Sequence, residues 1–252
     1  MLFSSIVYGP IRSRRLGVSL GVNLMPTTAK LCSFDCVYCE CGWNQPVSHP
    51  VLPTREQVRD AMVAQLSNID LQLDVITFSG NGEPTMHPDF LGIIEDTCAL
   101  RDEYCPNAKV SVLSNSTQLG RKEVVEGLRL CDNRILKLDS AIDATMHLID
   151  KPVNRSLTVA QVMEWLRGFD GDFTLQTCFL RGEYEGQMID NTTPDELDAW
   201  YKAVEQLRPK QVMIYVIDRE TPLKTLEKVA PEQMYAIAQP LREKGIDVVV
   251  SV

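Results

Sequence analysis

Three cysteines lie within one short segment of the chain. Cys32, Cys36 and Cys39 are separated by three and then two residues, and Tyr38 directly precedes the last of them. Thiolates are soft ligands that select zinc or iron–sulfur clusters, and a closed zinc site needs four ligands, usually as two separated pairs. No matching pair follows in this sequence. Three thiolates on a four-iron, four-sulfur cube leave one iron open, so the pattern predicts a cluster that acts on a small molecule.

A second motif follows the apolar segment 74–79, which reads as a short buried strand. Two glycines, a glutamate and a proline come directly after this strand; they are Gly80, Gly82, Glu83 and Pro84. Glycine allows the backbone to approach a ligand without a Cβ in the way. The motif therefore indicates a ligand-binding strand end, with an ordinary glycine turn before a helix as the structural alternative.

The cysteine spacing resembles the signature of the radical S-adenosylmethionine (SAM) superfamily, and the second motif resembles its Gly-Gly-Glu-Pro sequence. The resemblance implies a [4Fe–4S] cluster on the three cysteines, whose open iron chelates the amino and carboxylate groups of SAM. One electron from the cluster would cleave SAM to methionine and a 5′-deoxyadenosyl radical, which abstracts hydrogen from a substrate. The residues implied to contact the cofactor here are Tyr38, Gly80, Gly82, Glu83 and Pro84. Asn81 departs from the superfamily pattern, which has a small residue at this step.

The segment 8–17, taken with both motifs, looks most like uncharacterised iron–sulfur oxidoreductases grouped with wyosine tRNA synthases. Those synthases hold a second cluster on earlier cysteines, and no cysteine precedes Cys32 here. The chain has 25 basic and 34 acidic residues and a net charge of −9, which gives no general attraction to nucleic acid or to an anionic membrane. We therefore predict an enzyme with an unidentified substrate that is not nucleic acid, reduced by a flavodoxin or ferredoxin.

Strand-like and helix-like segments alternate along the chain. Strands are expected at 18–25, 74–79, 109–114, 135–139, 173–180, 211–217 and 246–250, and helices at 55–67, 89–104, 121–130, 159–168, 193–207 and 231–244. Such alternation predicts an α/β fold with parallel strands in right-handed βαβ units. The resemblance implies a partial (β/α)6 barrel in a single domain over 1–252, with 1–17 as a lead segment. A doubly wound open sheet is the alternative, and in both folds ligands gather where the strands end.

Lys137 and Asp139 alternate with leucines on a predicted strand and therefore share one face. Buried charges need a partner or a ligand, so a mutual ion pair and contact with the ribose or methionyl carboxylate of SAM both remain open. Ser114 and Asn115 end the preceding strand and resemble the superfamily's ribose-contacting step. A turn cap is the alternative role for Asn115.

Later strand ends and one loop supply candidates for substrate contact. Cys178 is interpreted as a small buried apolar residue, with hydrogen donation near the radical or anchoring of the substrate as its alternative. Arg181 is a candidate to hold an anionic group. Asp218 and Arg219 either contact substrate or form a surface pair with each other, and Arg155 either clamps a carboxylate of the cofactor or substrate or is an exposed loop residue.

The basic concentration Arg12, Arg14 and Arg15 precedes the first predicted strand and is expected at the amino-terminal side of the sheet. It serves either as a solvated surface or in recognition of phosphate or carboxylate. Cys41 breaks the ligand spacing and is expected to line the loop. The sequence has eight cysteines without a disulfide framework, no apolar run that could span a bilayer and no signal peptide, which predicts a cytoplasmic protein without membrane partners.

Two other functions remain open. A glycyl-radical activase is similarly small and uses the same cofactors to act on a protein, although its usual N-terminal glycine and arginine pattern is not matched. A non-catalytic iron–sulfur electron carrier or zinc module would bind the cysteines but has no need of the second motif. A zinc site would also need a fourth ligand, and Cys41 is the one offered nearby.

Overall fold

The computed structural model describes residues 2–13, 15–46 and 48–252, and its internal contacts divide the chain into two compact units. The first comprises Met1–Ser33 and Asn44–Ile135, and the second comprises Phe34–Trp43 and Leu136–Val252. This division falls inside the cysteine segment, so Cys32 belongs to the first unit and Cys36 and Cys39 to the second. The expectation of one domain stays a prediction.

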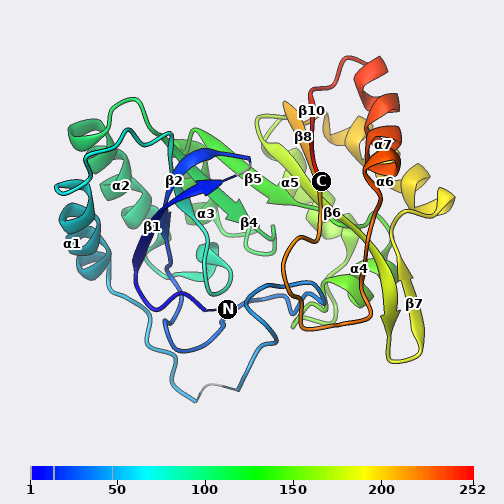
Figure 1. Cartoon of the computed structure of the whole chain (residues 1–252), viewed down its shortest axis with the longest axis horizontal. Helices are drawn as coiled ribbons and strands as arrows, with labels where there is room; N and C mark the ends of the chain where they lie inside the picture. The colour runs from blue at the N-terminus through cyan, green and yellow to red at the C-terminus, as the bar shows by residue number, and fades with distance from the viewer. Residues whose placement is uncertain (1, 14, 47) are drawn as a thin grey trace. The chain divides into compact units, whose positions relative to one another are not determined.

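The first unit contains parallel strands packed with three helices (Figure 1). Its elements are β1 (Val7–Ser13), β2 (Gly17–Val22), α1 (Arg55–Leu66), β3 (Val75–Phe78), the 3-10 helix η1 (Pro84–Met86), α2 (Phe90–Tyr104), β4 (Lys109–Ser114), α3 (Lys122–Leu130) and the first three residues of β5 (Asn133–Lys137). β2, β3 and β4 are parallel neighbours, and β1 is an antiparallel edge strand. Every residue of β3 is buried, so the glycine motif follows a strand that is fixed in the core.

The second unit begins with the cysteine loop 34–43 and continues from the last residues of β5. Its other elements are α4 (Asp143–Ile149), α5 (Val159–Arg167), β6 (Thr174–Tyr184), β7 (Gln187–Asp190), α6 (Pro194–Leu207), β8 (Gln211–Val216), β9 (Glu227–Lys228), α7 (Pro231–Glu243) and β10 (Val248–Ser251). β6, β8 and β10 are parallel neighbours, while β7 and β9 pair antiparallel with the far end of β6. The predicted helix start at Thr193 is present, with Pro194 as the first helical residue.

The predicted α/β alternation and parallel pairing are confirmed within each unit. Five elements were not predicted, namely β1, η1, α4, β7 and β9. β1 contains Gly9 and Pro10, which read as a loop, but an edge strand tolerates proline. α4 has only seven residues, too few for a clear helical period. β6 runs beyond its predicted end into a hairpin whose turn residues, Glu185 and Gly186, both have positive φ.

The basic segment lies at the amino-terminal end of the parallel strands, as predicted. Arg12 on β1 is opposite Val18 near the start of β2, whereas the glycine motif follows the carboxyl end of β3. Arg15 is partly buried, and Arg14 lies outside the described residues. In the described part of the chain, no helix combines the length and apolarity needed to cross a bilayer.

Candidate active site

The segment before Cys32 pairs directly with the glycine motif in the first unit. Leu31 and Gly82 form an isolated parallel bridge, in which the Leu31 N–H donates to the Asn81 carbonyl (2.9 Å) and the Leu31 carbonyl accepts from the Glu83 N–H (3.2 Å). A Cβ on Gly82 would lie 1.7 Å from the Leu31 oxygen. The structure thus gives a packing reason for glycine at this step, because its lack of a Cβ lets the two motifs pair. The expected approach of the backbone to a ligand stays a prediction.

Glu83 joins the carboxyl ends of β3 and β4. Its buried carboxylate accepts from the Thr85 N–H (3.1 Å) and hydroxyl (2.5 Å) at Oε1, and from the Asn115 N–H (2.6 Å) at Oε2. Burial raises the pKa of Glu83, while the bonds from Asn115 and Thr85 act to lower it. The Ser114 side chain is a further hydrogen-bond partner of this carboxylate. The expected bond from a methionyl ammonium to Glu83 stays a prediction.

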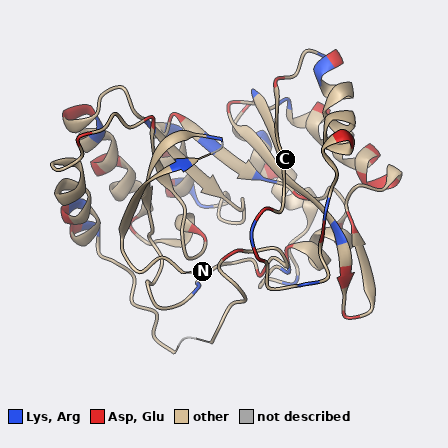
Figure 2. Ribbon diagram, viewed as in Figure 1, with Lys and Arg blue, Asp and Glu red and all other residues tan. Residues whose placement is uncertain are grey.

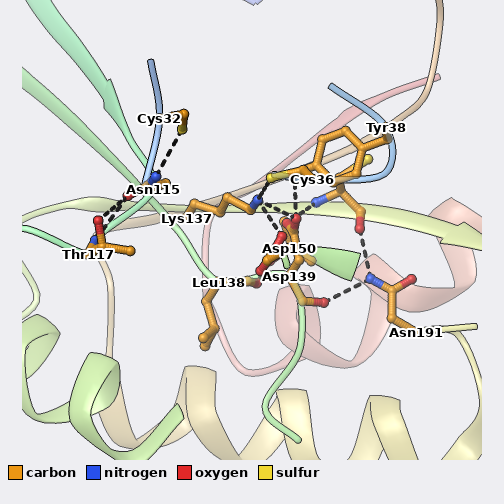
Figure 3. Close-up of polar contacts among 12 residues, drawn as sticks. Cys32, Cys36, Tyr38, Asn115, Thr117, Lys137, Leu138, Asp139, Asp150 and Asn191 are labelled. Carbon is orange, nitrogen blue, oxygen red and sulfur yellow. Dashed lines mark hydrogen bonds and ion pairs between the residues drawn. The ribbon is translucent and has the colours of Figure 1, made fainter. Parts of the chain in front are cut away.

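Asn115 connects the end of β4 to the first cysteine (Figure 3). Its Nδ2 donates to Ser33 Oγ (2.9 Å) and lies 3.5 Å from Cys32 Sγ. Its Oδ1 accepts from the N–H and hydroxyl of Thr117. The turn cap that the sequence left open for Asn115 is therefore present, and its Nδ2 reaches the cysteine segment. Contact with the ribose of SAM stays a prediction. Ser114 is buried beside it and accepts from the Ser116 N–H.

Asn81 binds the N-terminal segment and is fully buried. Its Nδ2 donates to the carbonyls of Phe3 (2.8 Å) and Pro26 (2.9 Å), and its Oδ1 accepts from the Phe3 N–H (2.8 Å). The Asn81 N–H in turn donates to Asn23 Oδ1 (3.0 Å). This residue departs from the superfamily pattern, and its side chain holds Phe3 beside the glycine motif.

Asn81→Ala is expected to lower the free energy of unfolding by about 2–4 kcal/mol, because three backbone groups lose a buried hydrogen-bond partner. Urea unfolding at constant pH measures the change. Asn68→Ala is the matched control, since Asn68 is exposed and makes one side-chain bond, to the Ala64 carbonyl in α1. It is expected to cost under about 1 kcal/mol. Equal stability of the two variants would show that Asn81 does not hold the N-terminal segment.

In the second unit, the cysteine loop docks on the end of α4. The Val37 N–H donates to the Ile149 carbonyl (2.9 Å), and the Asp35 N–H donates to the carbonyls of Asp150 (2.9 Å) and Lys151 (3.2 Å). Such carbonyls have no partner within their own helix, so the loop satisfies them. Lys151 has a φ of 45°, the left-handed conformation common just after a helix. The unpredicted helix α4 is thus the support of the loop.

Lys137 lies at the centre of a buried charge cluster (Figure 3). Its Nζ is 2.5 Å from Asp150 Oδ1 and 3.1 Å from Asp139 Oδ2, and the lysine side chain is 10% exposed. Its Nζ also donates to Cys36 Sγ (3.0 Å). Burial acts against its charge, but Asp139 and Asp150 raise the pKa of Lys137. The mutual ion pair of Lys137 and Asp139 is therefore present, with Asp150 as an added member.

Asp139 also connects the loop to β6. Its Oδ2 accepts from the Tyr38 hydroxyl (2.5 Å) and its Oδ1 from the Cys178 N–H (2.8 Å). Asn191, which follows β7, donates through Nδ2 to the carbonyls of Asp139 and Cys178 (2.8 Å each). Burial raises the pKa of Tyr38, and the nearby Asp139 charge raises it further. The Tyr38 hydroxyl is thus a neutral donor that fixes the loop on the strand.

The sequence identified neither Asp150 nor Asn191 as part of this network. Asp150 ends the short helix α4, and Asn191 follows an unpredicted hairpin. Both positions depend on tertiary structure. The one sequence signal for Asn191 was that it is a polar residue just before the predicted helix start at Thr193.

Cys178 is fully buried in an apolar cluster with Val37, Ile149, Leu180 and Ile189. Burial raises the pKa of its thiol. These surroundings are those expected for a small apolar residue. Its alternative role, hydrogen donation near the radical or anchoring of the substrate, stays a prediction.

Two of the remaining candidates, Arg181 and Arg155, lie in the second unit. Arg181 donates to Thr192 Oγ1 (2.9 Å) and Gln233 Oε1 (2.8 Å), which ties β6 to the residues before α6 and to α7. Its role as an anion holder stays a prediction. Arg155 is exposed, as one of its two interpretations has it.

The suggested surface pair between Asp218 and Arg219 is wrong in its partners. Arg219 instead pairs with Glu40 of the cysteine loop (2.8 Å), and Asp218 lies 3.8 Å from Lys228. Both residues lie beyond the end of β8, and Arg219 is in a bend, so strand alternation does not determine their directions. His87 lies just before α2, and its Nδ1 accepts from the Asp89 N–H (3.1 Å).

Comparison with known proteins identifies the family. The model of the Radical SAM superfamily matches residues 27–192, which include both sequence motifs. This chain belongs to the radical SAM superfamily. Members of the superfamily are enzymes that use a [4Fe–4S] cluster and SAM.

Two curated proteins with similar sequences are longer than this chain. The protein named GTPase Obg of Brachyspira hyodysenteriae is 29% identical over 90% of this chain, which spans 32% of that protein. The UPF0026 protein of Helicobacter pylori is 27% identical over 87% of this chain, which spans 68% of its length.

Two solved structures share the fold. SuiB of Streptococcus suis bound to SAM has a TM-score of 0.64 and 11% identity, over 89% of this chain and 48% of that one. TYW1 with a lysine–pyruvate adduct bound has a TM-score of 0.62 and 15% identity, over 89% of this chain and 73% of that one. The predicted fold class, the α/β core of radical SAM enzymes, is confirmed.

Proposed function

We propose that the protein is a radical SAM enzyme in which Cys32, Cys36 and Cys39 hold a [4Fe–4S] cluster. The cluster, when bound, supplies the electron that cleaves SAM to a 5′-deoxyadenosyl radical for hydrogen abstraction from an unidentified substrate. The observation that carries the proposal is the bridge between Leu31 and Gly82. It fixes the start of the cysteine segment against the strand-end motif, a pairing that an electron carrier or a zinc module does not need.

The donor set fits the cluster. Its three sulfur ligands are the type that iron–sulfur clusters take, and nitrogen donors from Asn115 and Lys137 reach the sulfurs of Cys32 and Cys36. In the described part of the chain, no three His, Cys, Asp or Glu side chains converge on one metal-ion position. A cluster binds each thiolate through a different iron, so its ligands need no common point.

The charge distribution supports a substrate other than nucleic acid. Figure 2 shows Lys and Arg interspersed with Asp and Glu along the helices of both units, and the net charge is −9. Nucleic-acid binding depends on many basic contacts with phosphates. A small molecule or a peptide, with a flavodoxin or ferredoxin as reductant, accords with this pattern better. A glycyl-radical activase remains the second candidate within the family.

Anaerobic reconstitution with iron and sulfide, followed by SAM and dithionite, tests the proposal. The wild type is expected to form 5′-deoxyadenosine, and Cys36→Ala to lose at least about a hundredfold of that activity, because loss of a ligand costs more than loss of a ligand's hydrogen-bond partner. Cys98→Ala, at a partly exposed thiol on α2, is the matched control and should retain full activity. Cys41→Ala should retain iron, since Cys41 lies outside the ligand spacing.

Three results would contradict the proposal. Iron uptake without SAM cleavage, even with a flavodoxin as reductant, would favour the electron carrier. Retention of zinc alone would establish the metal-binding module. Loss of iron in Cys41→Ala would show that a fourth cysteine closes the site, which leaves no open iron for SAM.

A further inference from the structure

Alternate residues of the cysteine loop surround the Lys137 ammonium. Its Nζ lies 4.9 Å from the ring centre of Phe34, 3.0 Å from Cys36 Sγ and 5.0 Å from the ring centre of Tyr38. The loop thus presents two ring faces and the sulfur between them to one cation. Attraction between a cation and an aromatic face strengthens when water is excluded, and here only 10% of the lysine side chain is exposed.

Two carboxylates fix the cation from the other side. Asp150 and Asp139, whose side chains are 2% and 0% exposed, lie 2.5 Å and 3.1 Å from Nζ. Asp139 is itself held by Tyr38 and Cys178, and the Asp150 carbonyl accepts from the loop. Both carboxylates that bind Lys137 are thus themselves held by other residues, so the fold determines the direction of the Lys137 ammonium toward Cys36.

We propose that Lys137 is a positioning residue of the iron–sulfur centre, which donates a hydrogen bond to the Cys36 thiolate and thereby raises the reduction potential of the bound cluster. The inference rests on the proposed function, because it takes Cys36 as a cluster ligand. It assigns Lys137 to the cysteine ligand, whereas the sequence suggested contact with SAM.

The physical reason is charge. Reduction adds one negative charge to the cluster, and hydrogen bonds to ligand sulfurs are among the factors that set iron–sulfur potentials. A donor on Cys36 stabilises the reduced state more than the oxidised state, because the sulfur carries more charge after reduction. Seen from the cluster, the charges of Asp139 and Asp150 offset the charge of Lys137. The short N–H···S contact is therefore the main contribution of Lys137 to the reduction potential.

The experiment compares Lys137→Met with Lys151→Met. Lys151 is the matched control because its ammonium also lies beside the loop, over the rings of Trp43 (5.4 Å) and Tyr184 (4.0 Å), and donates to the Tyr184 hydroxyl. Each variant removes one positive charge from the second unit, and only Lys137→Met removes the contact with a cysteine. Redox titration of the reconstituted cluster, followed by electron paramagnetic resonance without SAM, gives the potential.

Lys137→Met is expected to disfavour reduction at least tenfold, which is about 59 mV for a one-electron couple. Lys151→Met should shift the equilibrium less than twofold, and Lys137→Arg should restore most of the wild-type potential. Equal potentials in the wild type and Lys137→Met would overturn the inference, as would equal shifts in the two methionine variants, which would indicate only a distant charge effect.

Loss of Lys137 leaves two buried carboxylates together, so the single variant is paired with Lys137→Met/Asp150→Asn, which keeps the net charge. Both are expected to lower the potential, and an unshifted double variant would overturn the inference even where the single variant fails to fold. Iron and sulfide content of the wild type separates the two proposals. A wild type that assembles no cluster contradicts the proposed function, whereas an assembled cluster with an unmoved potential contradicts only the role of Lys137.

Discussion

Gly82→Ala is expected to prevent cluster assembly and to lower the free energy of unfolding by about 3–4 kcal/mol. The added Cβ would lie 1.7 Å from the Leu31 oxygen and 2.5 Å from the Leu31 carbonyl carbon. Both are backbone atoms that no rotamer change can move, so the bridge has to open. The loss of its two hydrogen bonds costs about 1 kcal/mol each, and the φ of 152°, which L-residues rarely adopt, adds about 1–2 kcal/mol.

Gly186→Ala separates the clash from the conformational cost. Gly186 also has a positive φ, 77°, but a Cβ there would meet no atom within 4 Å. This variant should lose about 1 kcal/mol of stability and take up as much iron as the wild type. Urea unfolding and iron analysis after reconstitution give both quantities. Wild-type iron content in Gly82→Ala would mean that the bridge between the motifs is not needed to hold the cluster.

Local sequence signals predicted most of the fold because most of its helices and strands can be recognised from a few consecutive residues. β3 is a run of apolar residues, and α6 starts with threonine and proline. The failures share a cause. β1, α4 and the hairpin after β6 are stabilised mainly by partners distant in sequence or by unusual turns, so periodicity in a short window does not reveal them.

The candidate site shows the same division. Cysteine spacing and the glycine motif identified the family, because such chemistry requires those residue types at adjacent positions. Strand alternation also placed Lys137 and Asp139 on one buried face. It did not reveal Asp150, because the end of α4 reaches them only through the tertiary fold. The sequence did not predict the pairing of Leu31 with Gly82 either. A backbone contact between residues 51 positions apart does not depend on a recognisable residue pattern.

Asp139→Asn is expected to destabilise the protein by about 3–5 kcal/mol, the usual cost of removing one partner from a buried ion pair. The carboxylate accepts from Tyr38, from the Cys178 N–H and from Lys137. An asparagine can still accept at Oδ1, and the Tyr38 hydroxyl could turn to accept from Nδ2, but the same Nδ2 would face the Lys137 ammonium, which can only donate. The side chain of residue 139 is fully buried, so water cannot relieve this conflict.

The same substitution should also free the cysteine loop, because Tyr38 and Lys137 both hold that loop through Asp139. Alkylation of Cys36 in the cluster-free protein, followed by peptide mass spectrometry, is expected to accelerate at least tenfold. Asp198→Asn is the matched control, since Asp198 is 66% exposed in a helical pair with Lys202 and should change stability by no more than about 0.5 kcal/mol. Slow alkylation of Cys36 in a destabilised Asp139→Asn would show that the carboxylate supports β6 and not the loop. That outcome would place the restraint on the loop in α4, whose terminal carbonyls bind Asp35 and Val37 independently of Asp139.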